Sequence, residues 1–200
     1  MHITRIESFR NNKIKIHIDG ELKFWLYKKD LKRYTIEEDA QLSPEEYDVF
    51  YKLNLQRGKK QVLNLLQRMD KTRQEVIRKL QESGYCEEII YDIMKYIDSY
   101  NYLDDDKYAR QYIRYKRESK SKREIERTLI IKGVSKDIIG QAISEEYGSE
   151  DEAIKKAIKK KNRSDNCDLS QDDLQKLMVY LYNRGFNMDI IRKHINIDKI

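Results

Sequence analysis

The first part of the chain alternates between apolar and polar residues with the period of a β-strand. Residues 13–18 read Lys-Ile-Lys-Ile-His-Ile, and residues 22–26 repeat the alternation after Asp19-Gly20. Asp-Gly between two alternating runs favours a tight hairpin, because glycine accepts the positive φ that such turns need. Residues 3–6 are a candidate third strand. A sheet this small needs helices to pack against, so we expect residues 1–42 to form a β-hairpin region that leans on helical structure.

The pattern changes at Ser43. The sequence Ser43-Pro44-Glu45-Glu46 combines an N-cap serine, a proline at the first helical position and a glutamate at N3, which together make a capping box. Apolar residues then recur with the helical period, and Gly58 is a candidate interruption. Residues 43–70 are therefore predicted to form a linking helix or two helices.

Three later segments resemble one another. Gly84, Gly133 and Gly185 set a common register, with spacings of 49 and 52 residues. Each segment reads as helix, glycine, helix, because a glycine commonly ends a helix in the left-handed conformation. The apolar positions that coincide in this register are Val76, Ile125 and Leu177, then Leu80, Leu129 and Leu181, and after the glycine Ile90, Ile139 and Ile191.

A third helix is predicted to follow each of the first two copies. It begins near Asp104 in copy one and near Ser149 in copy two, whereas copy three ends before any such helix. We place the repeats at residues 71–118, 119–163 and 170–200, the last being partial. Such units bury their apolar faces only by stacking on neighbours. The predicted fold class is mainly α, with tandem three-helix repeats in an elongated, curved array and a small N-terminal β-hairpin or sheet.

Positive charge is concentrated in two parts of the chain. The formal net charge is +6, from 41 basic and 35 acidic residues, and residues 107–132 hold ten basic residues against three acidic ones. Clustered positive charge attracts polyanions, and Tyr108 among these cations is a candidate for stacking. The alternative is an ordinary solvated helix face, but we favour a binding surface. Its candidate residues are Arg110, Arg114, Lys116, Arg117, Lys120, Lys122, Arg123, Arg127, Lys155, Lys156, Lys159 and Lys160.

Signals for catalysis are weak. The chain has three histidines, no glycine-rich phosphate loop and no H-E-x-x-H or G-x-S-x-G motif. Asp104, Asp105 and Asp106 are the best candidates for holding Mg²⁺, although acidic residues before an amphipathic run more often cap a helix. Arg184 is a candidate binding residue, with capping of the preceding helix an equally good interpretation. We expect no enzyme activity, no cofactor and no metal.

The remaining features indicate where the protein resides. Cys86 and Cys167 lie 81 residues apart and form no C-x-x-C motif, so free thiols in a reducing compartment are favoured. No apolar run approaches the length of a membrane span. A cytoplasmic monomer without membrane contact is expected.

Several of these motifs, in this order, resemble the RecX family. They are Thr72-x-x-Glu75-Val76, the acidic helix start Leu103-Asp104-Asp105-Asp106-Lys107-Tyr108-Ala109, then Leu129-x-x-Lys132-Gly133-Val134 and Tyr180-Leu181-x-x-Arg184-Gly185-Phe186. The N-terminal hairpin resembles the extension of longer, Gram-positive-type members. Two positions depart from the family: glycine is common where Asn101 stands, and a glycine-proline-like turn where residues 119–121 stand.

The resemblance implies a regulator of homologous recombination and DNA repair in the SOS response. Members bind RecA filaments on DNA and usually restrain their ATPase and strand exchange. DNA would then be contacted directly or through the filament. The alternatives are a helical repeat protein that binds nucleic acid by itself, a Mg²⁺-dependent nuclease built on the aspartates, and a scaffold for an unrelated protein.

Overall fold

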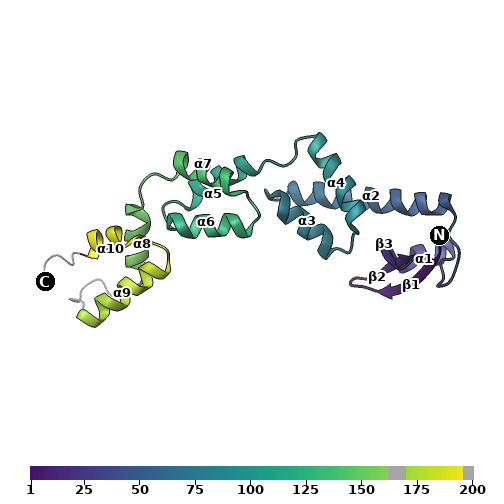
Figure 1. Ribbon diagram of the computed structural model, residues 1–200, viewed down its shortest axis with the longest axis horizontal. Coiled ribbons are helices and arrows are strands. Elements are labelled where there is room, and N and C mark those ends of the chain that lie inside the picture. The colour runs from purple at the N-terminus through teal and green to yellow at the C-terminus, as the bar shows by residue number, and fades with distance from the viewer. Residues whose placement is uncertain (162–169, 196–200) are drawn as a thin grey trace. The chain divides into compact units, whose positions relative to one another are not determined.

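The computed structural model describes residues 1–161 and 170–195 (Figure 1). The chain divides into two compact units, the first over Met1–Leu103 and the second over Asp104–Ile200. Within the described residues the chain contains one three-stranded sheet and ten helices, so the mainly helical prediction is confirmed.

The sheet of the first unit is antiparallel with the strand order β1-β2-β3. Its strands are β1 (Ile3–Ser8), β2 (Lys13–Ile18) and β3 (Glu21–Tyr27). Asp19 and Gly20 join β2 to β3 with φ values of 50° and 87°, as the hairpin pattern predicts for a two-residue turn. The candidate third strand is confirmed as β1, which pairs with β2.

Two helices follow the sheet. Helix α1 (Lys28–Tyr34) was not predicted, and its first turn is held by Asp30, which accepts a hydrogen bond from the Tyr27 amide at 2.9 Å. Helix α2 (Pro44–Leu66) begins at the predicted capping box of Ser43. The expected interruption at Gly58 is wrong, because α2 continues through this buried residue.

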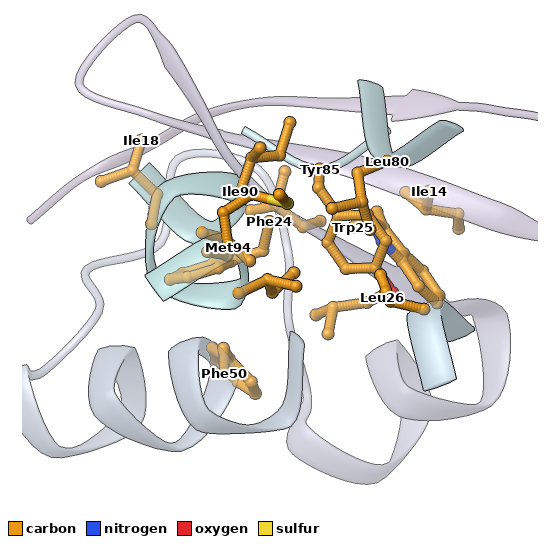
Figure 2. Packing of buried hydrophobic residues seen from close by; sticks show 14 of the residues in the cluster. Ile14, Ile18, Phe24, Trp25, Leu26, Phe50, Leu80, Tyr85, Ile90 and Met94 are labelled. Carbon is orange, nitrogen blue, oxygen red and sulfur yellow. The ribbon is translucent and has the colours of Figure 1, made fainter. Parts of the chain in front are cut away.

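Helices α3 (Arg73–Glu82) and α4 (Glu87–Ser99) complete the first unit. A single apolar cluster joins them to the sheet and α2. Figure 2 shows Phe24 and Trp25 of β3 in this cluster with Phe50 of α2, Leu80 of α3 and Met94 of α4. Burying aromatic and aliphatic side chains from every element gives the small sheet the helical support that it needs.

The second unit contains two groups of three helices. Helices α5 (Asp105–Lys116), α6 (Lys122–Ile131) and α7 (Lys136–Glu146) share one apolar cluster. Helices α8 (Asp151–Lys161), α9 (Gln171–Asn183) and α10 (Met188–Ile195) share another.

These groups begin one helix earlier than the repeats that we placed at 119–163 and 170–200, because the helix that ends one predicted repeat packs with the helices of the next. The first predicted repeat, 71–118, likewise loses its last helix to the group that follows. Helix α5 packs with the helices that follow it, since Ala109 and Ile113 lie in the same cluster as Leu129. Likewise α8 packs with α9 and α10, so the last group has three helices in the described chain. Sequence similarity aligns the helices but does not say on which neighbour the connecting helix packs.

The glycine register itself is confirmed. Gly84, Gly133 and Gly185 have φ values of 91°, 83° and 89°, and each ends the first helix of a helical pair. In all three copies the amide after the glycine donates to the carbonyl of the aligned leucine, with distances of 3.3, 3.1 and 3.2 Å. This is the bond pattern of a Schellman motif, in which the donor residue also packs on the helix end. The donors, all buried, are Tyr85, Val134 and Phe186.

Asn101 stands in a position that also needs a left-handed residue. Its φ is 52°, in the turn between α4 and α5. Asparagine tolerates this conformation better than other residues with a Cβ atom. The departure from the glycine common in the RecX pattern is therefore compatible with the same turn.

Candidate polyanion-binding surface

The arginines of α5 face α7 and form ion pairs there. Arg114 makes a two-pronged contact with Glu146, with N···O distances of 2.6 and 2.5 Å. Arg110 contacts Asp106 on its own helix and Glu145 on α7. These hydrogen bonds raise the pKa of both arginines and hold the pKa of Glu145 and Glu146 below the usual range. The two arginines thus have a structural role in joining α5 to α7.

Two other candidates near α5 are also partly engaged. Arg117 donates to the backbone carbonyl of Glu146 at 3.1 Å. Lys120 pairs with Glu124 at 3.0 Å. Lys116, in contrast, has its ammonium group 4.3 Å from the ring centroid of the exposed Tyr115. The positive charge of Arg117 and Lys120 is therefore less available to a ligand than a count of basic residues in the sequence indicates.

Helix α6 presents cations without such partners. Lys122, Arg123 and Arg127 are exposed, and none of the three forms an ion pair with a residue that the structure describes. Lys122 and Arg123 lie in the first turn, and Arg127 follows Arg123 by four residues, which places these two on the same side of the helix. These three side chains are the candidates best placed to meet an external anion.

Helix α8 carries the second group of lysines. Lys155 pairs with Glu152 at 3.0 Å, and Lys156 pairs with Glu118 at 2.8 Å. Lys159 and Lys160 lie exposed in the last turn, with no acidic partner among the described residues. Cations in a last turn also complement the helix dipole.

Arg184 lies at a junction between the two helical groups of the second unit. Its guanidinium group contacts Glu124 of α6 at 2.9 Å, and its carbonyl accepts a hydrogen bond from Ser121 at 2.6 Å. Burial acts to lower the pKa of Arg184, but the bonds to Glu124 and Tyr180 outweigh burial and raise it. The carbonyl bond and the ion pair fit a structural role better than an exposed binding role.

The acidic helix start has a capping function. Asp104 is the N-cap of α5 and accepts a hydrogen bond from the Lys107 amide at 2.9 Å. Asp105 and Asp106 occupy the first turn, where negative charge complements the helix dipole. Tyr108 stacks on Tyr112, with the ring centroids 6.4 Å apart. Within the described residues, no three metal-ligating side chains come together as a metal site.

The remaining expectations concern thiols and membranes. The Cys86 thiol donates to the carbonyl of Lys23 at 3.1 Å, and burial raises its pKa. Cys167 lies outside the described residues. None of the described helices is both long enough and apolar enough to span a bilayer.

Charge counting missed the residues that neutralise α5. Glu145 and Glu146 lie outside the basic stretch in the sequence, yet they meet its arginines in space. Arg110 and Arg114, spaced four apart, lie on one face of their helix. The adjacent acidic pair at the end of the second helix after it is the signal that could have found this contact.

Comparisons with known proteins bear on the whole chain. Models of three RecX domains match it: the first three-helix domain over residues 59–96, the second over 104–143 and the third over 149–195. The second and third ranges begin at the same helices, α5 and α8, as the two helical groups of the second unit.

Individual relatives agree with the domain matches. The chain is 30% identical to a regulatory protein RecX of Caldanaerobacter subterraneus subsp. tengcongensis, over 98% of this chain and 100% of that protein. It is 32% identical to one of Clostridium perfringens, over 97% and 96%. A crystal structure of a regulatory protein RecX is similar with a TM-score of 0.61 at 21% identity, over 98% of each chain. A crystal structure of RecX from Lactobacillus salivarius gives 0.59 at 25% identity, over 73% of this chain and 97% of that one.

Proposed function

This chain belongs to the RecX family of regulatory proteins, and from that premise we propose that it binds RecA filaments on DNA and restrains their ATPase and strand exchange. The observation that carries the proposal is the set of exposed cations on α6, Lys122, Arg123 and Arg127. Their charge is not neutralised by the described residues, so it is available to acidic protomer surfaces or to DNA phosphates.

The proposal assigns different roles to the thirteen candidate cations. Lys122, Arg123 and Arg127 make the central contact, supported by Lys116, Lys159 and Lys160. Arg110, Arg114 and Arg184 act through the structure, because their guanidinium groups already hold carboxylates. Arg117, Lys120, Lys155 and Lys156 are rim residues that contribute less, since each already has a partner within the chain.

The test is a triple charge reversal on α6, Lys122→Glu, Arg123→Glu and Arg127→Glu. RecA-catalysed ATP hydrolysis and strand exchange on DNA are measured with increasing amounts of the protein. The wild type is expected to slow both, and the triple variant to lose this effect while its circular-dichroism melt stays within a few degrees of wild type, as for surface substitutions.

The matched control is the triple reversal Lys28→Glu, Lys32→Glu and Lys95→Glu, at exposed positions of the first unit. It changes the net charge by the same amount and is expected to keep the effect on RecA. Full inhibition by the α6 variant would rule out this surface. A wild-type protein that leaves RecA activity unchanged or accelerates it would rule out the inhibitory role.

A second candidate is direct binding of nucleic acid, favoured by the exposed lysines Lys159 and Lys160 near the end of α8. Titration of labelled single- and double-stranded DNA at several salt concentrations, with RecA absent, tests it. Tight binding that weakens steeply with salt supports direct contact. Binding that requires RecA supports contact through the filament.

A further inference from the structure

The first unit contains a cavity that the surface on the second unit does not involve. Its volume is about 470 Å³, and it lies where β2 and β3 meet α2 and α3. Five cationic side chains line it, and the lining residues that the structure describes include no carboxylate. The cations are Lys13, Arg57, Lys60, Arg68 and Lys79.

One buried polar atom on the cavity residues, Nη1 of Arg57, has no hydrogen-bond partner in the described structure. Nε1 of Trp25 and the hydroxyl of Tyr85 are also buried; burial raises the pKa of Tyr85, and a hydrogen bond between these two side chains acts to lower it by less. Trp25 is 2% exposed and Tyr85 4%, and the two rings, both labelled in Figure 2, pack edge to face with their centroids 5.5 Å apart. Buried polar groups are nearly always satisfied in native proteins, so the unpaired arm of Arg57 beside the cavity indicates an absent partner that accepts hydrogen bonds.

Lys13 and Arg57 both lie near the Trp25 ring, and of these two cations only Arg57 contacts a carboxylate in the described structure. Arg57 contacts Asp30 through Nη2 at 2.8 Å, which leaves its other arm unpaired. The Lys13 ammonium group lies 3.8 Å from the Trp25 ring centroid and donates to the carbonyl of Ser83 at 3.0 Å. Burial, and then the charge of Arg57, lower the pKa of Lys13.

Of the outer cations, Lys79 is already paired, with Glu82 at 3.4 Å at an exposed position. Lys60 and Arg68 are exposed and form no ion pair with a described residue. An anion in the cavity would therefore relieve repulsion among several cations and offer an acceptor to the unpaired arm of Arg57.

We propose that this cavity binds a phosphoryl group, supplied by a nucleotide or by a nucleic-acid strand. A phosphoryl group offers several acceptor oxygens around one centre, which suits donors that converge from a sheet and two helices. A single carboxylate offers two oxygens and one charge, fewer than the site can engage. Trp25 and Tyr85 are too deeply buried to stack on a base, so recognition rests on the phosphate.

Trp25 makes the test specific to this site, because it is the only tryptophan in the sequence. Its fluorescence is recorded while inorganic pyrophosphate is added to the full-length protein at constant ionic strength, with sodium chloride as the reference. A saturable change that weakens with added salt is expected for pyrophosphate and not for chloride. ATP and an oligothymidylate without terminal phosphates are then titrated separately. A response to ATP assigns the site to nucleotides and a response to the oligonucleotide to strands, and either supports the proposal.

Two charge reversals at the cavity rim, Lys60→Glu and Arg68→Glu, are tested singly. Each is expected to weaken pyrophosphate binding about tenfold, whereas Lys95→Glu, an exposed reversal on α4 away from the cavity, is expected to leave it unchanged. The proposal is overturned if pyrophosphate gives no saturable change at millimolar concentration. It is also overturned if Lys95→Glu weakens binding as much as the rim variants do. Circular dichroism checks that all three variants fold.

Discussion

The packing of α4 on α2 depends on a glycine in the middle of a helix. A Cβ atom added at Gly58 would lie 2.1 Å from Cδ1 and 3.0 Å from Cγ1 of Ile93, and 3.4 Å from the Tyr85 ring. Ile93 is fully buried, so its side chain has little room to turn away. Gly58→Ala is therefore expected to force α2 and α4 apart locally.

The expected magnitude is a difference between two effects. Replacing a mid-helix glycine by alanine stabilises by about 0.5–1 kcal/mol through helix propensity. Overpacking of a filled core costs about 1–3 kcal/mol. The free energy of unfolding of Gly58→Ala should therefore fall by about 1 kcal/mol. For a unit of this size, that change corresponds to a decrease of roughly 4–8 °C in melting temperature.

Gly140 provides a matched control on α7. It is an exposed mid-helix glycine, and a Cβ atom there would meet nothing within 4 Å. Gly140→Ala should therefore stabilise the second unit by about 0.5–1 kcal/mol, the opposite sign from the same change at Gly58. Urea unfolding of the first unit is followed by Trp25 fluorescence, and far-ultraviolet circular dichroism reports both units.

The clash can be tested directly by shortening Ile93. Ile93→Val removes the Cδ1 atom and alone should cost about 0.5–1.5 kcal/mol. Combined with Gly58→Ala, it should cost less than the sum of the two single changes, because the shorter side chain accepts the new methyl group. Additive effects, or a Gly58→Ala variant at least as stable as wild type, would refute this account of the α2–α4 contact.

Three further predictions concern the second unit. Ser121→Ala should cost about 1–2 kcal/mol, more than Ser170→Ala, because Ser121 caps α6 from a buried position and also bonds the end of α9; thermal melts compare the two. Gly185→Ala should lower the free energy of unfolding in urea more than Gly148→Ala does. Both changes add about 1–2 kcal/mol of strain at a left-handed position, but only the Cβ atom at Gly185 would lie 2.9 Å from another side chain. The pKa of Glu146 is lowered in the folded protein, so the stability that its carboxylate contributes is complete above the ordinary pKa of 4.5 and is lost as the pH falls through the lowered pKa. The melting-temperature difference between wild type and Glu146→Gln should therefore be clear at about pH 7 and vanish at lower pH.

Local features of the fold could be predicted from sequence because the signals and the structure lie in the same few residues. Asp19-Gly20 predicts the hairpin, and the Ser43 capping box predicts the start of α2. The three glycines predict the helix ends, since each is required at a left-handed position. In the same way Asp104 could be assigned as a cap, because its acceptor role is satisfied three residues away.

Features that depend on contacts between distant parts of the chain were harder to predict from the sequence. Gly58 resembles a helix interruption in the sequence, and only the proximity of Ile93 shows why a glycine is needed there. The cavity in the first unit collects Lys13, Arg57 and Lys79 from segments that are far apart in sequence. No local pattern unites such residues, and the positive charge of this region is spread thinly along the chain.

The binding surface shows why a count of basic residues overstates what a ligand can meet. Arg110 and Arg114 contribute charge to the sequence tally, yet Glu145 and Glu146 take up their hydrogen bonds in joining α5 to α7. Reversing either arginine would place like charges together and weaken the fold, so lost activity would not identify a binding residue. Reversal on α6 lacks this ambiguity, since its exposed cations hold no described carboxylate. The separation of structural from available charge therefore decides which variants can report on partner binding.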